Sequence, residues 1–482
     1  MTSRRAFLAA GVGVAASLSF KPVFGQTRDL VSLSLKQASE LLRTKAVSPV
    51  ELTEACLQRI EKYNSAFNAF ITVARNEALQ AARNAEAEIR RGQWRGPLHG
   101  MPIALKDNMD TAGIRTTGAS AVFENRVPNI DAEAARRLKN AGCVLLGKLN
   151  LHEFAYGGSS NVTHFGTMRN PWAPDRVTGG SSGGAGIAVA ADFCYAALGT
   201  DTAGSVRMPS SHCGIVGLKP TYGLVSTRGV MTLSWSLDHV GPMCKTVEDA
   251  AIMMNVIAGH DPLEPTSVEA TIPDYTRALK TSTAKLRLGI VRRPFFDNLD
   301  AEVAKAVEAA IALLARLTAG APVEVEQLPA PGNAAALWGP EAYAYHKPWI
   351  TATPEKYQPG TRAQLQRTAN TNAAEYAQAR RDLDLVRREI RKVFNKVDLL
   401  VAPTMKTPPA LLSAPGGGAG GNNNVAFDMY GVPSISVPCG FTSSGLPIGL
   451  QISGGHFSEM NVLALANAYE RATDWHKRNP QL

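Results

Sequence analysis

The 482-residue sequence lacks the features that mark several common classes of protein. It has no run of lysine and arginine and no basic stripe interleaved with aromatic residues, so its formal charge of +9 is not concentrated for nucleic-acid binding. It contains no internal repeat and no change of composition that would mark a linker between domains. Hydrophobic residues make up 45% and charged residues 19%, which is the balance of a globular protein and not of a disordered one.

The first 25 residues are expected to form an export signal. Arg4 and Arg5 precede an apolar run over residues 9–20, which is too short to span a bilayer. Residues 3–8, SRRAFL, resemble a twin-arginine export signal, the type that carries folded proteins. We expect cleavage after Gly25, a periplasmic protein, and no stable membrane insertion after cleavage. An ordinary secretion signal and a basic helix that stays attached are the alternatives.

The six cysteines include no C-x-x-C pair, the spacing that is typical of zinc and redox sites. They are Cys56, Cys143, Cys194, Cys213, Cys244 and Cys439. A periplasmic protein can form disulfides, but one that folds before export sets its core with reduced thiols. We therefore expect buried free cysteines, no metal site and no cofactor.

Helical and strand patterns alternate through residues 26–482, which we expect to form one large domain. Capping boxes begin helices at Ser34 and Ser48, and a short apolar strand at residues 101–105 ends at Lys106. Residues 286–328 form a strand-helix-strand unit. This order predicts an α/β fold with a mixed, mostly parallel sheet covered by helices on both faces. The glycine-rich segment 414–424 is expected to be a surface loop, and a lid function is left open.

Residues 178–186, TGGSSGGAG, contain two serines among glycines and match the pattern G-x-S-x-G. A hydrolase elbow needs a buried strand directly before its serine, but residues 169–178 contain two prolines and several polar residues. A phosphate-binding loop is excluded because no G-x-x-x-x-G-K-[ST] pattern and no strand followed by G-x-G-x-x-G is present. The segment therefore belongs to neither familiar class.

A further serine, Ser205, follows a small-residue loop, and the loop's backbone amides are candidates to hold a developing oxyanion. Serine needs a base, and Lys106 would have a lowered pKa if the end of its apolar strand is buried. A solvated surface lysine is the alternative on the residues alone. A Ser-His-Asp triad stays open on spacing alone. The histidines near these segments are His152, His164, His212 and His239.

Three stretches occur in a characteristic order: GMPIALKDNMDTAG at 100–113, VTGGSSGGAG at 177–186, and GTDTAGSVRMPSSHCGIVGLKPTYGLVS at 199–226. Together with SLDHVGPM at 236–243 and YGVPSISVPCGF at 430–441, they resemble the amidase signature family. The resemblance extends over about residues 50 to 454. It implies the amidase signature fold and a serine hydrolase with a Ser-cisSer-Lys triad.

The resemblance also implies a role for each motif residue. Ser205 matches the nucleophile that forms an acyl-enzyme, Ser181 matches the serine after a cis peptide bond, and Lys106 matches the base. Ser182 matches a serine that hydrogen-bonds the triad. The backbone amides of the loop before Ser205 would form the oxyanion hole. These are the amides of Thr202, Ala203 and Gly204, together with that of Ser205 itself.

Charged residues beside these motifs are expected to support the site. Asp201 and Arg207 would brace the nucleophile loop, and Asp107 would either orient Lys106 or cap a turn. Two positions depart from the family pattern. Ala203 stands where a glycine is frequent, and Asp428 stands where many relatives have asparagine. Asp428 would disfavour anionic substrates if it lined the pocket and would have no role if it faced solvent.

The sequence thus predicts an exported amidase that hydrolyses a small carboxamide, aryl amide or carbamate to a carboxylate and an amine. A subunit similar to glutamyl-tRNA amidotransferase A, which supplies ammonia, and a non-catalytic binding protein on the same fold are the alternatives. Export would disfavour the amidotransferase, whose chemistry needs cytoplasmic tRNA. The expected partner is a small-molecule amide, with a homodimer possible and no nucleic acid. Residues 333–391 are expected to determine the substrate.

Overall fold

The computed structural model describes residues 27–414 and 421–482. The expected export signal and residues 415–420 of the glycine-rich segment lie outside the described residues. Within the described ranges, none of the helices has the length and apolar character needed to cross a bilayer.

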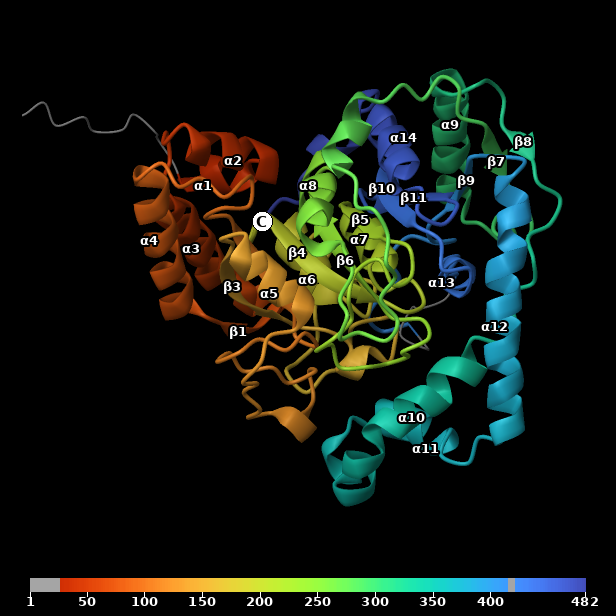
Figure 1. The fold of residues 1–482 in the computed structure, drawn as a ribbon, viewed down its shortest axis with the longest axis horizontal. Coiled ribbons are helices and arrows are strands. Elements are labelled where there is room, and N and C mark those ends of the chain that lie inside the picture. The colour runs from red at the N-terminus through yellow and green to blue at the C-terminus, as the bar shows by residue number, and fades with distance from the viewer. Residues whose placement is uncertain (1–26, 415–420) are drawn as a thin grey trace, which may run out of the picture.

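Eleven strands form one sheet through the middle of the molecule, in the order β1-β3-β2-β4-β6-β5-β10-β11-β9-β7-β8 (Figure 1). The strands are β1 Phe70–Val73, β2 Pro102–Lys106, β3 Val144–Leu149, β4 Ala196–Asp201, β5 Val216–Lys219, β6 His239–Cys244, β7 Leu288–Ile290, β8 Val323–Glu324, β9 Leu399–Pro403, β10 Ser434–Phe441 and β11 Pro447–Gly454. The expected strand-helix-strand unit is confirmed as β7, a helix and β8.

The sheet is mixed, as expected, but it is not mostly parallel. Of the ten strand pairs in the described residues, the four pairs β2-β3, β2-β4, β7-β8 and β7-β9 are parallel and six are antiparallel. Parallel strands need long crossover connections, whereas β10 and β11 are joined by a short turn and pair antiparallel, with Ile435 opposite Ile452. The sequence pattern predicts individual strands such as residues 101–105 but carries little information on strand direction.

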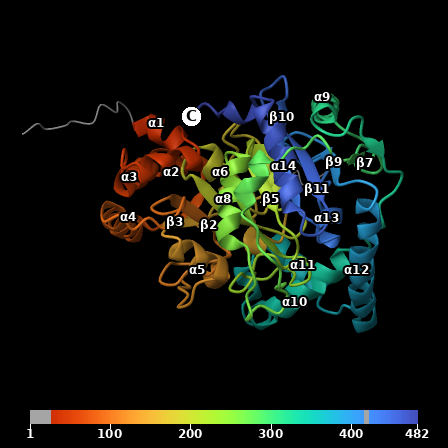
Figure 2. The same ribbon diagram turned by 45° about the horizontal axis from the view of Figure 1, so that its top comes forward.

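Helices cover both faces of the sheet, as expected (Figures 1 and 2). Helices α6 (Gly183–Ala190) and α7 (Arg207–Cys213) pack on one face, and α8 (Val247–Ile257), α9 (Ala301–Leu317) and α14 (Glu459–Arg471) pack on the other. Helix α6 is buried on all sides and consists of small apolar residues. A Cβ added at Gly184 would lie 2.4 Å from the carbonyl oxygen of Asn150, so only glycine permits this close packing.

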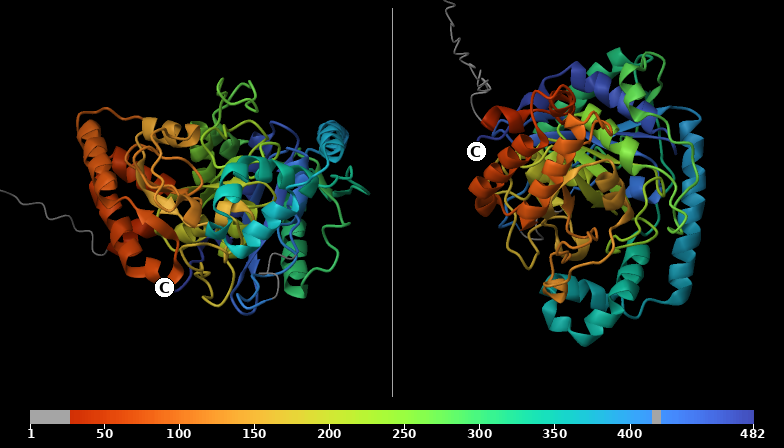
Figure 3. Two further views of the ribbon diagram at one scale, coloured as in Figure 1. Left: turned by 90° about the horizontal axis from the view of Figure 1, so that it is seen from below. Right: turned by 60° about the vertical axis from the view of Figure 1, so that its left-hand side comes forward.

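The remaining helices extend from this core. They are α1 Thr27–Ser32, α2 Leu35–Arg43, α3 Pro49–Phe67, α4 Arg75–Arg90, α5 Glu133–Asn140, α10 Ala335–Ala352, α11 Pro359–Arg367, α12 Ala373–Phe394 and α13 Val425–Met429. Both predicted capping boxes are present, at Ser34 and Ser48. Helices α10 and α11 lie at one end of the molecule and α12 runs along its side (Figures 1 and 3).

All six cysteines are buried and free, which confirms the expectation. Burial raises the pKa of the Cys56 thiol to about 12. The thiols therefore act as small apolar side chains of the core.

Candidate active site

Lys106 ends strand β2 with its side chain fully buried. Its amino nitrogen donates hydrogen bonds to Ser181 Oγ and Thr200 Oγ1, both at 2.7 Å. Burial lowers the pKa of Lys106 to about 7, although the charges of Asp201 and Asp238 act in the opposite direction. A large fraction of this lysine is therefore neutral near pH 7 and able to accept a proton.

Ser181 and Ser182 lie in the loop that leads into α6, and both are buried. The Gly180–Ser181 peptide bond is cis, as the family resemblance implies. Ser182 Oγ donates to the carbonyl oxygen of Thr200 at 3.2 Å and accepts from the Thr200 amide at 3.3 Å. The two adjacent serines thus have different contacts, because Ser181 meets the lysine and Ser182 joins the loop to the end of β4.

Ser205 lies between β4 and α7 and lines a cavity of about 190 Å³. The other lining residues are Ala155, Tyr156, Gly157, Gly158, Thr202, Ala203, Met208, Leu233, Trp338, Gln364 and Asn422. Trp338 and Gln364 come from α10 and α11, within the region expected to determine the substrate. A larger cavity of about 1200 Å³ lies among residues of α2, α8 and α14, and its lining includes none of Lys106, Ser181 and Ser205.

The backbone amides expected to hold an oxyanion differ in whether they already donate a hydrogen bond. The Gly204 amide donates to Asp201 Oδ1 at 2.5 Å, so it is already engaged and the expectation for this residue needs correction. The reason is that the Asp201 carboxylate also accepts from the Val206 amide and so caps the start of α7. Among residues 27–414 and 421–482, the amides of Ala203 and Ser205 donate no hydrogen bond. They remain the predicted oxyanion donors, together with Thr202.

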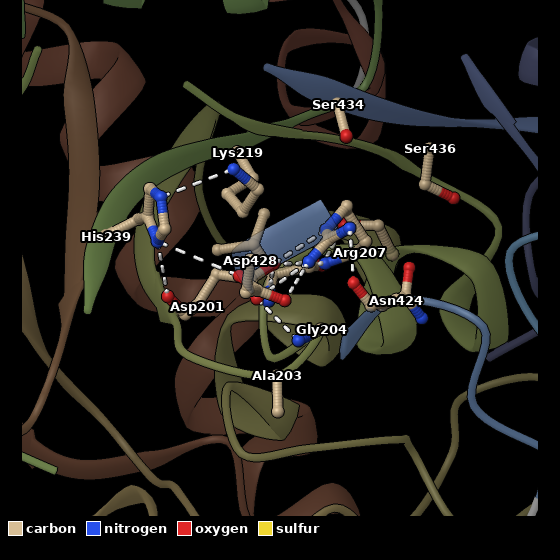
Figure 4. Close-up of polar contacts among 12 residues, drawn as sticks. Asp201, Ala203, Gly204, Arg207, Lys219, His239, Asn424, Asp428, Ser434 and Ser436 are labelled. Atoms are coloured by element: carbon tan, nitrogen blue, oxygen red, sulfur yellow. Dashed lines mark hydrogen bonds and ion pairs between the residues drawn. The ribbon is translucent and has the colours of Figure 1, made fainter. Parts of the chain in front are cut away.

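Arg207 and the carboxylates of Asp201 and Asp428 form a buried cluster beside the loop that carries Gly204 (Figure 4). Arg207 Nε donates to Asp201 Oδ2 at 3.0 Å, and Nη2 donates to Asp428 Oδ2 at 2.6 Å. Burial alone would raise the pKa of Asp201, but Arg207 holds it well below its usual value. Burial raises the pKa of Asp428, and the positive charge of Arg207 opposes part of that rise.

This cluster answers two questions that the sequence left open. Asp201 and Arg207 brace the loop, as expected. Both alternatives for Asp428 are wrong, because it neither lines the cavity around Ser205 nor faces solvent. Asp428 is instead the second partner of the buried Arg207 guanidinium.

The histidines do not form a triad with Ser205. No histidine ring hydrogen-bonds Ser205 within the described part of the chain. The ring of His239 contacts the Asp201 carbonyl oxygen at 3.1 Å and Lys219 Nζ at 3.3 Å (Figure 4). Burial lowers the pKa of His152 and of His212 to about 4. These histidines are neutral side chains of the interior near pH 7.

Asp107 caps a turn and does not orient Lys106. Its Oδ2 accepts from the Thr117 amide at 2.9 Å, and its Oδ1 lies 3.5 Å from the amino nitrogen of the buried Lys148. Burial raises the pKa of Asp107, and Lys148 opposes that shift. Of the two roles left open from the sequence, the structural one is present.

Three residues that lie in the hydrogen-bond network of Lys106 and Thr202 were not singled out from the sequence. Thr200 Oγ1 accepts from Lys106 and also from Asn108 Nδ2 at 3.1 Å. Asp238 Oδ1 accepts from Thr202 Oγ1 at 2.6 Å. All three residues lie within the quoted motifs, which could have identified them as candidates. Asp238 is 36 residues from Thr202, and only the antiparallel pairing of β4 with β6 brings them together.

No group of three or more His, Cys, Asp or Glu side chains in the described ranges is arranged to hold a metal ion.

The Amidase family model matches residues 51–463. The chain belongs to the amidase signature family. An amidase from Pseudomonas putida is 41% identical over 468 residues, covering 94% of this chain and 98% of the relative. The glutamyl-tRNA(Gln) amidotransferase A subunit from Carboxydothermus hydrogenoformans is 40% identical over 487 residues, covering 94% of this chain and 100% of the relative.

The solved structure of 6-aminohexanoate cyclic dimer hydrolase matches with a TM-score of 0.84 and 28% identity, covering 94% of this chain and 99% of that chain. The single α/β domain with its eleven-stranded mixed sheet is thus the amidase signature fold. Enzymes of this family are hydrolases that act on carbon–nitrogen bonds of small amides.

Proposed function

We propose that this chain is an amidase that hydrolyses a small carboxamide, aryl amide or carbamate through an acyl-enzyme on Ser205. The observation that carries the proposal is the contact of 2.7 Å between the buried Lys106 amino group and Ser181 Oγ. The proposed nucleophile, Ser205, lines a cavity of about 190 Å³. A lysine with a pKa of about 7 is a suitable general base near neutral pH.

In the first half of the reaction, Ser205 Oγ forms a bond to the amide carbonyl carbon. Its proton passes to Ser181 Oγ while the Ser181 proton passes to the lone pair of neutral Lys106. The carbonyl oxygen takes the negative charge and is held by loop amides, for which Ala203 and Ser205 are the candidates. When the carbon–nitrogen bond breaks, the same relay returns the proton to the leaving amine.

In the second half, water replaces the amine. Lys106 accepts the water proton through Ser181, and the hydroxide oxygen bonds to the acyl carbon. The bond to Ser205 Oγ breaks, the serine regains its proton through the relay, and a carboxylic acid leaves and ionises. One water is consumed for each amide bond cleaved.

The ammonia-supplying subunit of an amidotransferase is the second candidate, and the 40% identity to a subunit of that name supports it. The two functions differ in what the purified chain does without partners. An amidase releases carboxylate and amine alone and at a constant rate, whereas an amidotransferase subunit depends on its complex. A binding protein would have neither activity, and the assembled Lys106, Ser181 and Thr200 contacts disfavour that alternative.

We also propose that residues 1–25 direct export to the periplasm and are removed. The basis is the twin-arginine pattern with its short apolar run. N-terminal sequencing of protein recovered from the periplasm of an expressing bacterium should begin at Gln26. Full-length protein confined to the cytoplasm would contradict export and would strengthen the amidotransferase alternative.

Covalent labelling with a fluorophosphonate, followed by peptide mapping, tests the proposed chemistry. An adduct is expected on Ser205, and it should be absent from Ser205→Ala and strongly reduced in Lys106→Ala. Release of ammonia from simple carboxamides by the same preparations should follow the labelling. An adduct on Ser181 or Ser182 would overturn the assignment of the nucleophile.

A further inference from the structure

The cavity beside Ser205 is lined, among the described residues, by uncharged side chains only. Tyr156, Met208, Leu233 and Trp338 provide apolar and aromatic walls. At about 190 Å³ the cavity is smaller than the several hundred cubic ångströms of a pocket for a drug-sized ligand. It suits a compact group attached to the scissile carbonyl.

Two carboxylates that contact the segments around this cavity, those of Asp238 and Asp201, are bound by other groups of the protein. Asp238 Oδ1 accepts from Thr202 Oγ1, and its Oδ2 accepts from the Leu233 and Ser234 amides, both at 3.0 Å. The buried Asp201 is paired with Arg207. Their carboxylates are thus held by the protein and are not part of the lining.

Arg367 is a charged residue whose field reaches one of the lining residues. Burial raises the pKa of the Tyr156 phenol, and the charge of Arg367 opposes that shift. Arg367 is exposed at the end of α11 and does not line the cavity. Its charge is solvated and screened, so it does not provide a buried partner for an anion.

Neutral polar groups are available in the lining. The side-chain amide of Gln364 and the indole nitrogen of Trp338 have no hydrogen-bond partner within residues 27–414 and 421–482. Asn422, in contrast, is committed, since its Nδ2 donates to the Ala203 carbonyl oxygen at 2.6 Å and its Oδ1 accepts from the Asn424 amide at 2.9 Å. Gln364 can therefore offer both its NH2 donor group and its carbonyl acceptor to a neutral substrate group.

We infer that the substrate is an amide whose acyl group is compact, uncharged, and apolar or aromatic, and that Gln364 and Trp338 select it. A carboxylate or ammonium placed in this lining would lose hydration without an oppositely charged partner, which is unfavourable. Zwitterionic amino-acid amides such as L-glutamine and anionic amides such as succinamate are excluded on this ground. The inference rests on the proposed amide hydrolysis and names the substrate class of the same site.

A matched panel of primary amides tests the class, with ammonia release as the readout. Benzamide and isobutyramide are neutral, while L-glutamine and succinamate carry charge in the acyl group. We expect kcat/KM for the better neutral amide to exceed that for either charged amide by about 100-fold or more. Equal or faster turnover of a charged amide would overturn the inference and leave the amidase function intact.

Labelling of Ser205 separates the two proposals. If Ser205 is labelled by a fluorophosphonate and neither neutral amide is turned over, the inference fails. If Ser205 is not labelled and no amide is hydrolysed, the proposed function itself fails. Turnover of the neutral amides alone supports both.

A charge placed at residue 364 should reverse the preference. Gln364→Arg is expected to raise kcat/KM for succinamate and lower it for benzamide, shifting their ratio by about tenfold or more. The matched control is Gln366→Arg, which adds the same charge at an exposed position of the same helix. A ratio that shifts equally in both variants, or in neither, would contradict the role of Gln364. Trp338→Ala should raise KM for benzamide more than for isobutyramide, because it removes an aromatic wall.

Discussion

The amino nitrogen of Lys106 and the hydroxyl oxygen of Ser181 lie 2.7 Å apart in a site where both side chains are fully buried. This contact joins the end of strand β2 to the loop before α6, two segments that are 75 residues apart in the chain. Burial makes the contact chemically useful, because the same desolvation that isolates Lys106 also lowers its pKa to about 7. The lowered pKa of the proposed base therefore depends on packing around β2 as much as on the motif itself.

The first prediction concerns pH. Because Lys106 must be neutral to accept a proton and its pKa is about 7, kcat/KM for a neutral amide should rise with pH through about 7 and level off above it. Well below that pKa the rate should fall about tenfold for each pH unit. The fluorophosphonate labelling rate of Ser205 should show the same dependence. A labelling rate that does not change between about pH 5.5 and 8.5 would mean that another group is the base.

The same shift predicts how stability depends on pH. The pKa of Lys106 is lower in the folded protein than in the unfolded chain, so between about 7 and the usual lysine value the unfolded state binds more protons. This group therefore adds stability as pH rises through that window. Lys106→Met should be stabilised relative to the wild type more at about pH 6.5 than at about pH 9.5 by urea unfolding. A constant difference at both pH values would contradict the shifted pKa.

Thr200 should orient the base through its hydroxyl. Thr200→Val keeps the shape but removes the acceptor for Lys106 Nζ and Asn108 Nδ2, and kcat should fall by about tenfold, the effect of losing one hydrogen bond to a charged or reacting group. Thr200→Ser keeps the hydroxyl and should retain most of the activity. The pH at half-maximal rate should also move in the valine variant and not in the serine variant. Equal rates in the two variants would show that the hydroxyl has no part in positioning Lys106.

The candidate triad residues could be named from the sequence because each lies in its own contiguous motif. Lys106, Ser181 and Ser205 each follow from local residue order and family resemblance, and the structure brings Lys106 and Ser181 into direct contact. The capping boxes at Ser34 and Ser48 also depend on residues only three positions apart. Interactions of this range are visible in a linear sequence.

Long-range packing explains what the sequence did not show. Asp428 pairs with Arg207 across 221 residues, and Asp238 binds Thr202 only because β4 and β6 pair antiparallel. The direction of strands such as β10 and β11 depends on which connections pack best, which local propensity does not encode. The engaged Gly204 amide is a local exception, since Asp201 lies only three residues before it and also accepts from the Val206 amide at the start of α7.

Asp428 should contribute to stability through Arg207. Asp428→Ala leaves a fully buried guanidinium with one carboxylate partner instead of two, and we expect a loss of about 3–5 kcal/mol in the free energy of unfolding. Asp428→Asn keeps an oxygen acceptor for Arg207 Nη2 and should cost clearly less. The exposed Glu355→Ala is the matched control and should change stability by less than about 0.5 kcal/mol. Urea unfolding measures the stability of the three variants. An Asp428→Ala variant as stable as the control would show that Asp201 alone satisfies Arg207.

Glu341 should hold the cavity wall in place. Its buried carboxylate accepts from Ser234 Oγ at 2.5 Å, from the Ser236 amide at 3.2 Å and from Tyr376 OH at 2.8 Å, so it ties α10 to α12 and to the loop that carries Leu233. Trp338 lies one turn before it on the same helix. Glu341→Ala leaves these donors buried without their acceptor and should cost about 3 kcal/mol of stability.

The loss of Glu341 should also change catalysis in a specific way. Because the wall that carries Trp338 loosens while the triad contacts stay in place, KM for a neutral aromatic amide should rise by about tenfold with a smaller change in kcat. Glu341→Gln keeps one acceptor and should give an intermediate KM, and the exposed Glu375→Ala on α12 should leave both constants unchanged. Steady-state kinetics on the three variants, below their unfolding temperatures, makes the comparison. A fall in kcat with KM unchanged would place the effect of Glu341 on the nucleophile loop, through Asp238 and Thr202, instead of on the cavity wall.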